Sequence, residues 1–91
     1  MENVLIISSS KNASEVLSNF MKESFRCGIR TAETSYQAKN ILDSVPSIEL
    51  AVINSPLTDE TGAGLAEYII ENTSAYCILI IKAELAEKHM D

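Results

Sequence analysis

The chain has 91 residues, enough for one domain, and its 46% hydrophobic and 22% charged residues are typical of a folded globular protein rather than a disordered one. Thirteen acidic and seven basic residues give a net charge of −6, with the basic residues scattered, so we expect no direct nucleic-acid binding by this segment. No apolar run approaches the roughly 20 residues of a membrane helix, so we also expect a cytoplasmic protein with no membrane partner.

The first predicted element is a strand at residues 4–7, an aliphatic run that stops at Ser8 and Ser9. Such a run is typical of a strand buried on both faces of a parallel sheet. The helix that follows has an apolar stripe at helical spacing, made up of Val16, Leu17, Phe20 and Met21. Asn12 paired with Glu15 is one candidate for its N-cap, and Ser10 is another.

Residues 28–33 are predicted to form a second strand, which is more polar, as expected near the edge of a sheet. The second helix begins near Ser35 and ends before Pro46, because a proline pushes the residue before it out of helical geometry. Its apolar side carries Tyr36, Ala38, Ile41, Leu42 and Val45. The third predicted strand covers residues 48–53 and is followed by Asn54.

A polar loop at residues 55–62 leads into a third helix, whose apolar side carries Leu65, Ala66, Ile69 and Ile70. Residues 76–81 form the fourth predicted strand. Residues 84–90 have helix-forming composition but are too few to hold as an isolated helix. Strands and helices therefore alternate, which predicts an α/β fold with a doubly wound parallel sheet covered on both faces.

With this order of elements, the chain resembles the receiver domain of response regulators, which has a flavodoxin-like fold. The spacing from Asn54 to Gly62 matches the family's interval between the phosphoacceptor and the glycine that opens the third helix, and Ala83 matches the alanine after the fourth strand. The resemblance covers nearly all of residues 1–91 and implies the strand order 2-1-3-4, with the family's fifth strand and last helix absent. It also implies an output domain downstream, which in one branch of the family is an RNA-binding antiterminator domain.

The resemblance places the family's functional positions on residues that carry no negative charge. The acidic pair falls on Ser8 and Ser9, the phosphoacceptor on Asn54, and the switch position on Lys82, followed by Ala83. Phosphoryl transfer to a receiver needs a carboxylate nucleophile and a divalent cation held by oxygen ligands. Because an amide is not nucleophilic and three carboxylates are lost together, we expect no bound metal, no cofactor and no enzymatic activity.

Lys82 offers a cation where the family has a hydroxyl group. We hypothesise that its ammonium group takes the place of the missing metal ion, bonded to an oxygen of Asn54 or Ser8 or paired with Asp59 or Glu60. The alternative is a lysine that extends into water at the end of a strand, where ion pairs contribute little.

Asp59 and Glu60, in the predicted loop, also admit two interpretations. They form either a displaced acidic pair with residual phosphoryl-transfer chemistry, or solvated carboxylates near the N-terminus of the third helix, whose dipole favours negative charge. The hydroxyl run at residues 8–10 has no adjacent base to activate a nucleophile, so we expect a turn and a helix cap there.

These observations predict a pseudo-receiver: a signalling module that accepts no phosphoryl group and acts through contacts with its own output domain, a regulator or a kinase. The expected setting is bacterial two-component signal transduction, a phosphorelay, or the regulation of transcription or antitermination. A free-standing dimerisation domain without signal input is the alternative. We expect a homodimer, because the apolar fourth strand would expose unpaired backbone groups at the edge of the sheet.

Overall fold

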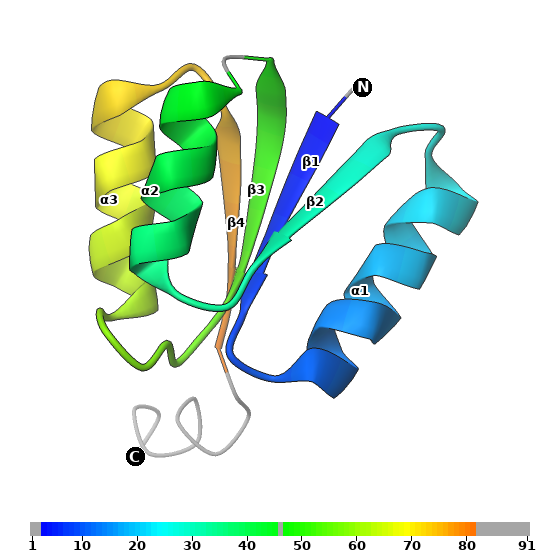
Figure 1. Ribbon diagram of the computed structural model, residues 1–91, viewed down its shortest axis with the longest axis horizontal. Helices are drawn as coiled ribbons and strands as arrows, with labels where there is room; N and C mark the ends of the chain where they lie inside the picture. Colours follow the sequence, from blue (N-terminus) through cyan, green and yellow to red (C-terminus); the bar gives the residue numbers. More distant parts are fainter. Residues whose placement is uncertain (1–2, 46, 82–91) are drawn as a thin grey trace.

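The computed structural model describes residues 3–45 and 47–81, in which four strands alternate with three helices (Figure 1). The strands are β1 (Asn3–Ser8), β2 (Gly28–Ala32), β3 (Ile48–Asn54) and β4 (Tyr76–Ile80), and the helices are α1 (Lys11–Ser24), α2 (Ser35–Ser44) and α3 (Gly62–Asn72). All neighbouring strands are parallel and lie in the order β2-β1-β3-β4, so the predicted fold class and strand order are confirmed. Lys82, Ala83 and the predicted terminal helix lie outside the described residues.

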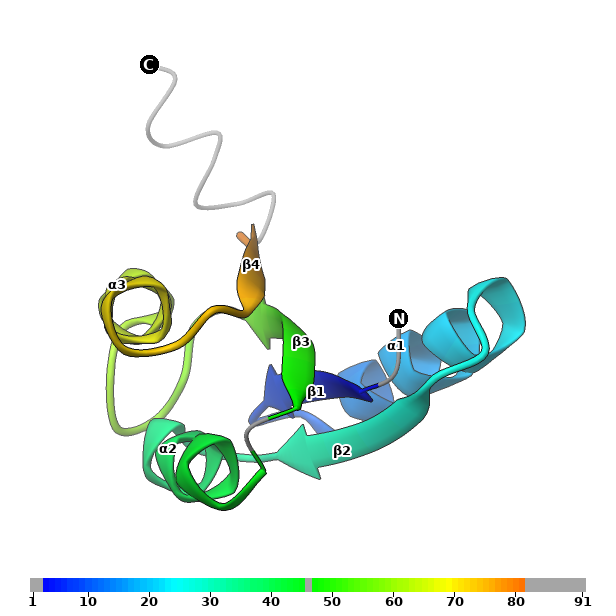
Figure 2. The same cartoon turned by 90° about the horizontal axis from the view of Figure 1, so that it is seen from above.

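The helices cover the two faces of the sheet unequally, with α1 on one side and α2 and α3 on the other (Figure 2). The face toward α2 and α3 holds the larger core, which includes Leu5, Ile7, Ile53, Leu65 and Ile69. The face toward α1 holds a smaller core of Val4, Ile6, Met21, Leu50 and Val52. Successive side chains of a strand point to opposite faces, which is why β1 is aliphatic at every central position. Among the described residues, no helix is long and apolar enough to cross a membrane.

Each helix begins at a hydroxyl N-cap that accepts a hydrogen bond from a backbone N–H group in the first turn. The caps are Ser10, Thr34 and Thr61. The predicted N-cap pairing of Asn12 with Glu15 is therefore wrong, because α1 already begins at Lys11. Ser10, the other candidate, fills the role because its side chain reaches the N–H of Ala13.

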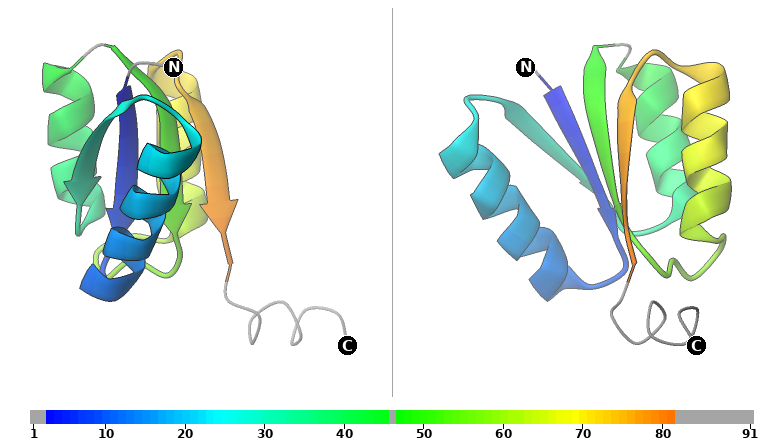
Figure 3. Two further views of the ribbon diagram at one scale, coloured as in Figure 1. Left: turned by 90° about the vertical axis from the view of Figure 1, so that its right-hand side faces the viewer. Right: turned by 180° about the vertical axis from the view of Figure 1, so that it is seen from behind.

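Several side chains of the predicted apolar stripes face solvent. In α1, Leu17 and Met21 pack against the sheet, whereas Val16 is 67% exposed and Phe20 is 59% exposed. Tyr36 of α2 and Ile70 of α3 are also exposed. Periodicity locates the apolar side of a helix, but how much of that side is buried depends on the neighbouring elements. Figure 3 shows α1 standing over one part of its face of the sheet, with β4 at the edge.

Candidate functional site

The carboxyl ends of the strands meet at one edge of the sheet, as they must when all strands are parallel. In the register of the sheet, Ser8 at the end of β1 pairs with Asn54 at the end of β3, and Asn54 pairs with Ile80 of β4. The structure thus brings together Ser8 and Asn54, which are more than 40 positions apart in sequence. Open parallel sheets bind their ligands at this edge.

The Ser8 hydroxyl group is the centre of a closed hydrogen-bond network. Asn54 Nδ2 donates to Ser8 Oγ at 3.1 Å, and the backbone N–H of Ser10 donates to the same oxygen at 3.2 Å. Ser8 Oγ in turn donates to the carbonyl oxygen of Ser10 at 3.2 Å. Ser8 is only 1% exposed, and its one donor and two acceptor positions are all used.

Ser9 joins this edge to the loop that follows β3. Its hydroxyl group donates to the carbonyl oxygen of Pro56 at 3.4 Å, and the backbone N–H of Ser55 donates to the carbonyl oxygen of Ile80 at 2.9 Å. The peptide bond between Ser55 and Pro56 is cis. The sequence does not single out Pro56 as a partner of Ser9, because the contact depends on how the loop folds back.

Gly62 begins α3 in a crowded position. A Cβ atom there would lie 2.8 Å from Leu79 Cδ1 and 3.0 Å from Ser55 Cβ. Only glycine fits without moving one of these neighbours. Packing therefore explains the glycine at this position of the chain: α3 begins close beside Leu79 of β4 and leaves no space for a side chain.

The residues that meet at the end of β1 and β3 carry no ionisable group. Hard divalent cations such as Mg²⁺ need oxygen ligands, usually with carboxylates among them. In the described part of the chain, no group of three or more His, Cys, Asp or Glu side chains is placed to hold a metal ion. Ser8, Ser9 and Asn54 offer neutral oxygens only, and those of Ser8 are already engaged.

A hollow of about 330 Å³ lies beside Asn54, between α1 and β4. Its walls are almost entirely apolar: Ala13, Val16, Leu17 and Ile80, with Asn12 and Asn54 at the edge. Such a lining offers few hydrogen-bond donors and no positive charge to bind a phosphoryl group.

Asp59 and Glu60 lie in the loop between β3 and α3, and their carboxylates contact α2. Asp59 accepts hydrogen bonds from the backbone N–H groups of Ser35 at 2.9 Å and Tyr36 at 3.0 Å. Glu60 accepts from the Ser35 hydroxyl group and pairs with Lys39 Nζ at 3.0 Å. Both residues directly precede Thr61, the N-cap of α3, and the hydrogen bonds of Asp59 show a contact that the sequence did not predict: this carboxylate caps the N-terminus of α2.

These contacts lower the pKa of both carboxyl groups. The backbone N–H of Ser35, then that of Tyr36, hold the pKa of Asp59 below its ordinary 3.8. The Ser35 hydroxyl group, then Lys39, hold the pKa of Glu60 below its ordinary 4.5. Both groups are ionised and engaged with α2, and within the described ranges neither bonds to Ser8, Ser9 or Asn54.

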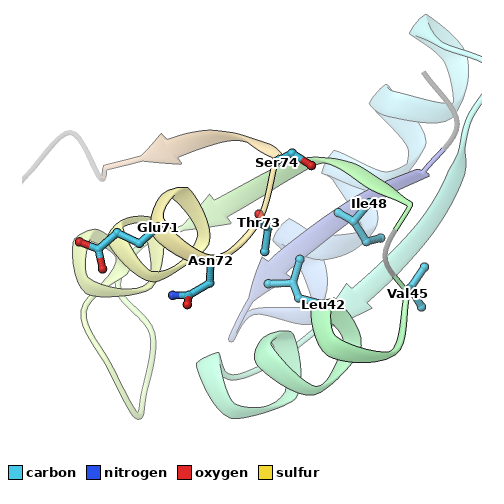
Figure 4. A pocket seen from close by; sticks show the side chains of 7 residues that line it. All are labelled: Leu42, Val45, Ile48, Glu71, Asn72, Thr73 and Ser74. Atoms are coloured by element: carbon cyan, nitrogen blue, oxygen red, sulfur yellow. The ribbon is translucent and has the colours of Figure 1, made fainter.

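A larger hollow of about 480 Å³ lies at the opposite end of the strands, where β3 begins (Figure 4). It is lined by Leu42, Val45, Ile48, Glu71, Asn72, Thr73 and Ser74. The side chains of Asn72 and Thr73 bond to carbonyl oxygens of their own helix, and Glu71 points away from Leu42 and Val45. This hollow offers no set of converging polar groups.

Solved structures similar to this chain include response-regulator receivers. The MaeR response regulator bound to beryllium trifluoride is 21% identical with a TM-score of 0.80, and the match covers 99% of this chain and 77% of that chain. A two-component response regulator from Clostridium difficile is 20% identical with a TM-score of 0.79, covering 99% of this chain and 75% of that chain. An Asp-to-Ala variant of MaeR bound to sulfate is 20% identical with a TM-score of 0.79, covering 98% and 76% respectively.

No family model matches the sequence, and no curated protein matches it either. At about one identical residue in five, the structural matches show the fold. The predicted flavodoxin-like receiver fold is thus confirmed.

Proposed function

We propose that this chain, which has the receiver fold of two-component response regulators, is a pseudo-receiver: a signalling module that works through protein contacts without accepting a phosphoryl group. Its partners in this proposal are an output domain, a regulator or a kinase in a bacterial cytoplasm, within signal transduction or the regulation of transcription or antitermination. It has no catalytic activity of its own.

The observation that carries the proposal is the Ser8–Asn54 hydrogen bond. Asn54 stands at the carboxyl end of β3, where a phosphoacceptor would have to lie, and its amide nitrogen donates to Ser8 Oγ at 3.1 Å. A phosphoryl group needs a nucleophilic carboxylate there and a cation to neutralise its charge. The network supplies neither, and its buried hydroxyl group is fully bonded.

Residual phosphoryl-transfer chemistry at Asp59 and Glu60 has less support. Four oxygen contacts tie these carboxylates to Ser35, Tyr36 and Lys39. Binding a metal ion through them would break contacts with α2.

A second candidate function, homodimerisation, is favoured by the apolar edge strand β4, whose Tyr76 is 79% exposed and whose Ile78 is 49% exposed.

The direct test is to incubate the chain with acetyl phosphate and Mg²⁺, and separately with beryllium trifluoride, using the MaeR regulator as the positive control because it binds beryllium trifluoride. We expect no phosphoryl adduct by mass spectrometry. We also expect that beryllium trifluoride leaves the amide chemical shifts in the NMR spectrum of the chain unchanged. A covalent adduct, or Mg²⁺ binding at submillimolar concentration, would overturn the proposal.

Variants of the same edge test the reason for the loss. The double variant Asn54→Asp with Ser9→Asp introduces two carboxylates at positions that are at least partly exposed, where a charged group can be accommodated. We expect its Mg²⁺ binding to become measurable by calorimetry. Ser9→Asn is the control, since it changes the size of the side chain without adding charge. Equal Mg²⁺ binding by the control and the double variant would contradict the charge explanation.

A further inference from the structure

The loop between β3 and α3 is tied to the first turn of α2 by two adjacent carboxylates. Figure 1 shows this loop and the start of α2 at the end of the molecule where the strands have their carboxyl ends. Asp59 takes the first two backbone N–H groups of α2, those of Ser35 and Tyr36. Thr34 takes the third, that of Gln37, through its own hydroxyl group. The N–H groups of Ser35, Tyr36 and Gln37 are therefore all bonded, two of them by another segment.

Glu60 extends the connection to a third element. Its carboxylate accepts from the Ser35 hydroxyl group and pairs with Lys39 Nζ at 3.0 Å. The same Lys39 ammonium lies 4.8 Å from the centre of the Tyr68 ring of α3, within the range of a cation–π contact. Through its ion pair with Glu60 and its contact with Tyr68, the Lys39 ammonium group connects the loop, α2 and α3.

Two features distinguish this cluster from an ordinary surface ion pair. Ser35 is 2% exposed, so its hydroxyl group would be buried without a partner if Glu60 moved away. Gly64, in the first turn of α3, leaves room for the Glu60 side chain: a Cβ atom there would lie 3.1 Å from Glu60 Oε2. Burial of the partner hydroxyl and space for the carboxylate both favour a single position of the loop.

We propose that Asp59 and Glu60 form a latch that locks the loop at residues 55–61 onto α2 and α3, so that these two helices are presented as one fixed surface. The latch goes beyond the pseudo-receiver proposal and stands whether or not Asn54 accepts a phosphoryl group. It assigns the two carboxylates a conformational role: they hold the loop in one position against α2 and α3.

Amide hydrogen exchange of the whole chain, followed by NMR, tests the latch at the atoms it protects. In Asp59→Ala we expect the N–H groups of Ser35 and Tyr36 to exchange roughly tenfold faster or more, because their acceptor is gone, while the amides of β1 keep their rates. Asp59→Asn retains one acceptor oxygen and should give an intermediate rate. Glu67→Gln, an exposed charge removal on α3, is the control and should change neither amide.

A double-mutant cycle tests the second half of the latch. Glu60→Gln and Lys39→Met should each speed exchange of the Ser35 amide, and the two changes together should have less than the summed effect because they remove the same ion pair. If Asp59→Ala leaves Ser35 and Tyr36 within about twofold of the Glu67→Gln control, the latch is wrong. It is also wrong if β1 amides accelerate as much as those of Ser35 and Tyr36, since the effect would then be global unfolding.

Discussion

At the scale of single residues, Ser8 sets the character of the candidate site more than Asn54 does. Asn54 is partly exposed, whereas Ser8 is buried and serves as hydrogen-bond partner both to Asn54 and to the backbone of Ser10. The aliphatic run of β1 predicted where the strand ends, and therefore that Ser8 and Asn54 would meet. It gave no sign that Ser8 would turn its hydroxyl group back onto the chain, because that depends on the conformation of the turn at residues 8–10.

Removing the Ser8 hydroxyl group should destabilise the fold. Ser8→Ala removes the buried oxygen that accepts from Asn54 Nδ2 and from the Ser10 N–H, and each such hydrogen bond contributes about 0.5–1.5 kcal/mol to the free energy of unfolding. Chemical denaturation should show this as a lower midpoint with an unchanged slope.

Ser9→Ala is the matched control for that measurement. Ser9 is exposed and its bond to Pro56 is long, at 3.4 Å, so its loss should change the free energy of unfolding by less than about 0.5 kcal/mol. Equal effects of the two substitutions would mean that the Ser8 network contributes nothing beyond an ordinary surface hydroxyl group.

At the scale of elements, sequence reasoning located every strand and helix of residues 3–81 to within a few positions. The aliphatic runs of β1 and β3 and the proline after α2 marked those boundaries. What it missed are contacts between elements. Nothing in the sequence near Asp59 identifies Ser35 as its partner, because the two residues are 24 positions apart and come together only through the tertiary fold. The exposure of Val16 and Phe20 likewise depends on the limited cover over α1.

The contact between the loop and α2 predicts a specific loss of stability in acid. The pKa values of Asp59 and Glu60 are lower in the folded chain than their ordinary 3.8 and 4.5, so the folded state binds protons less readily than the unfolded state. Their stabilising contribution is complete above about pH 4.5 and declines as the pH falls through the folded pKa values.

Urea denaturation between neutral pH and pH 3 measures this effect. The double variant Asp59→Asn with Glu60→Gln should lose less stability than the wild type over that interval, while Glu67→Gln should follow the wild type more closely. A double variant with the same acid dependence as the wild type would show that these two carboxyl groups do not carry the linkage.

At the scale of the whole molecule, β4 is the edge of the sheet formed by the described residues (Figure 3). It contains no charged residue, glycine or proline, and these are the features that usually protect an edge strand from another chain. If two copies pair antiparallel about a two-fold axis near Ile78, Tyr76 lies opposite Ile80 of the second copy. Aromatic and β-branched side chains make favourable cross-strand pairs. Because β4 carries no charge, pairing through it places no like charges of the two strands directly opposite each other.

Sedimentation velocity should therefore show a dimer that Ile78→Lys converts to a monomer. Ile70→Lys is the control, because Ile70 is an even more exposed isoleucine (66% against 49% for Ile78) that belongs to α3 rather than to β4, and its replacement should leave the dimer intact. A wild-type chain that remains monomeric at high micromolar concentration would contradict pairing through β4, as would an Ile78→Lys variant that still sediments as a dimer.

The two ends of the β3–α3 loop are held by different chemistry, and that difference gives each a separate response to acid. On one side, Ser9 and Ser55 hold the loop through hydroxyl and backbone groups that do not titrate in this range. On the other, Asp59 and Glu60 hold it through charge. Acidification should thus break the contacts of Asp59 and Glu60 with α2 first, while the contacts of Ser9 and Ser55 keep the ends of β1 and β3 in their native geometry.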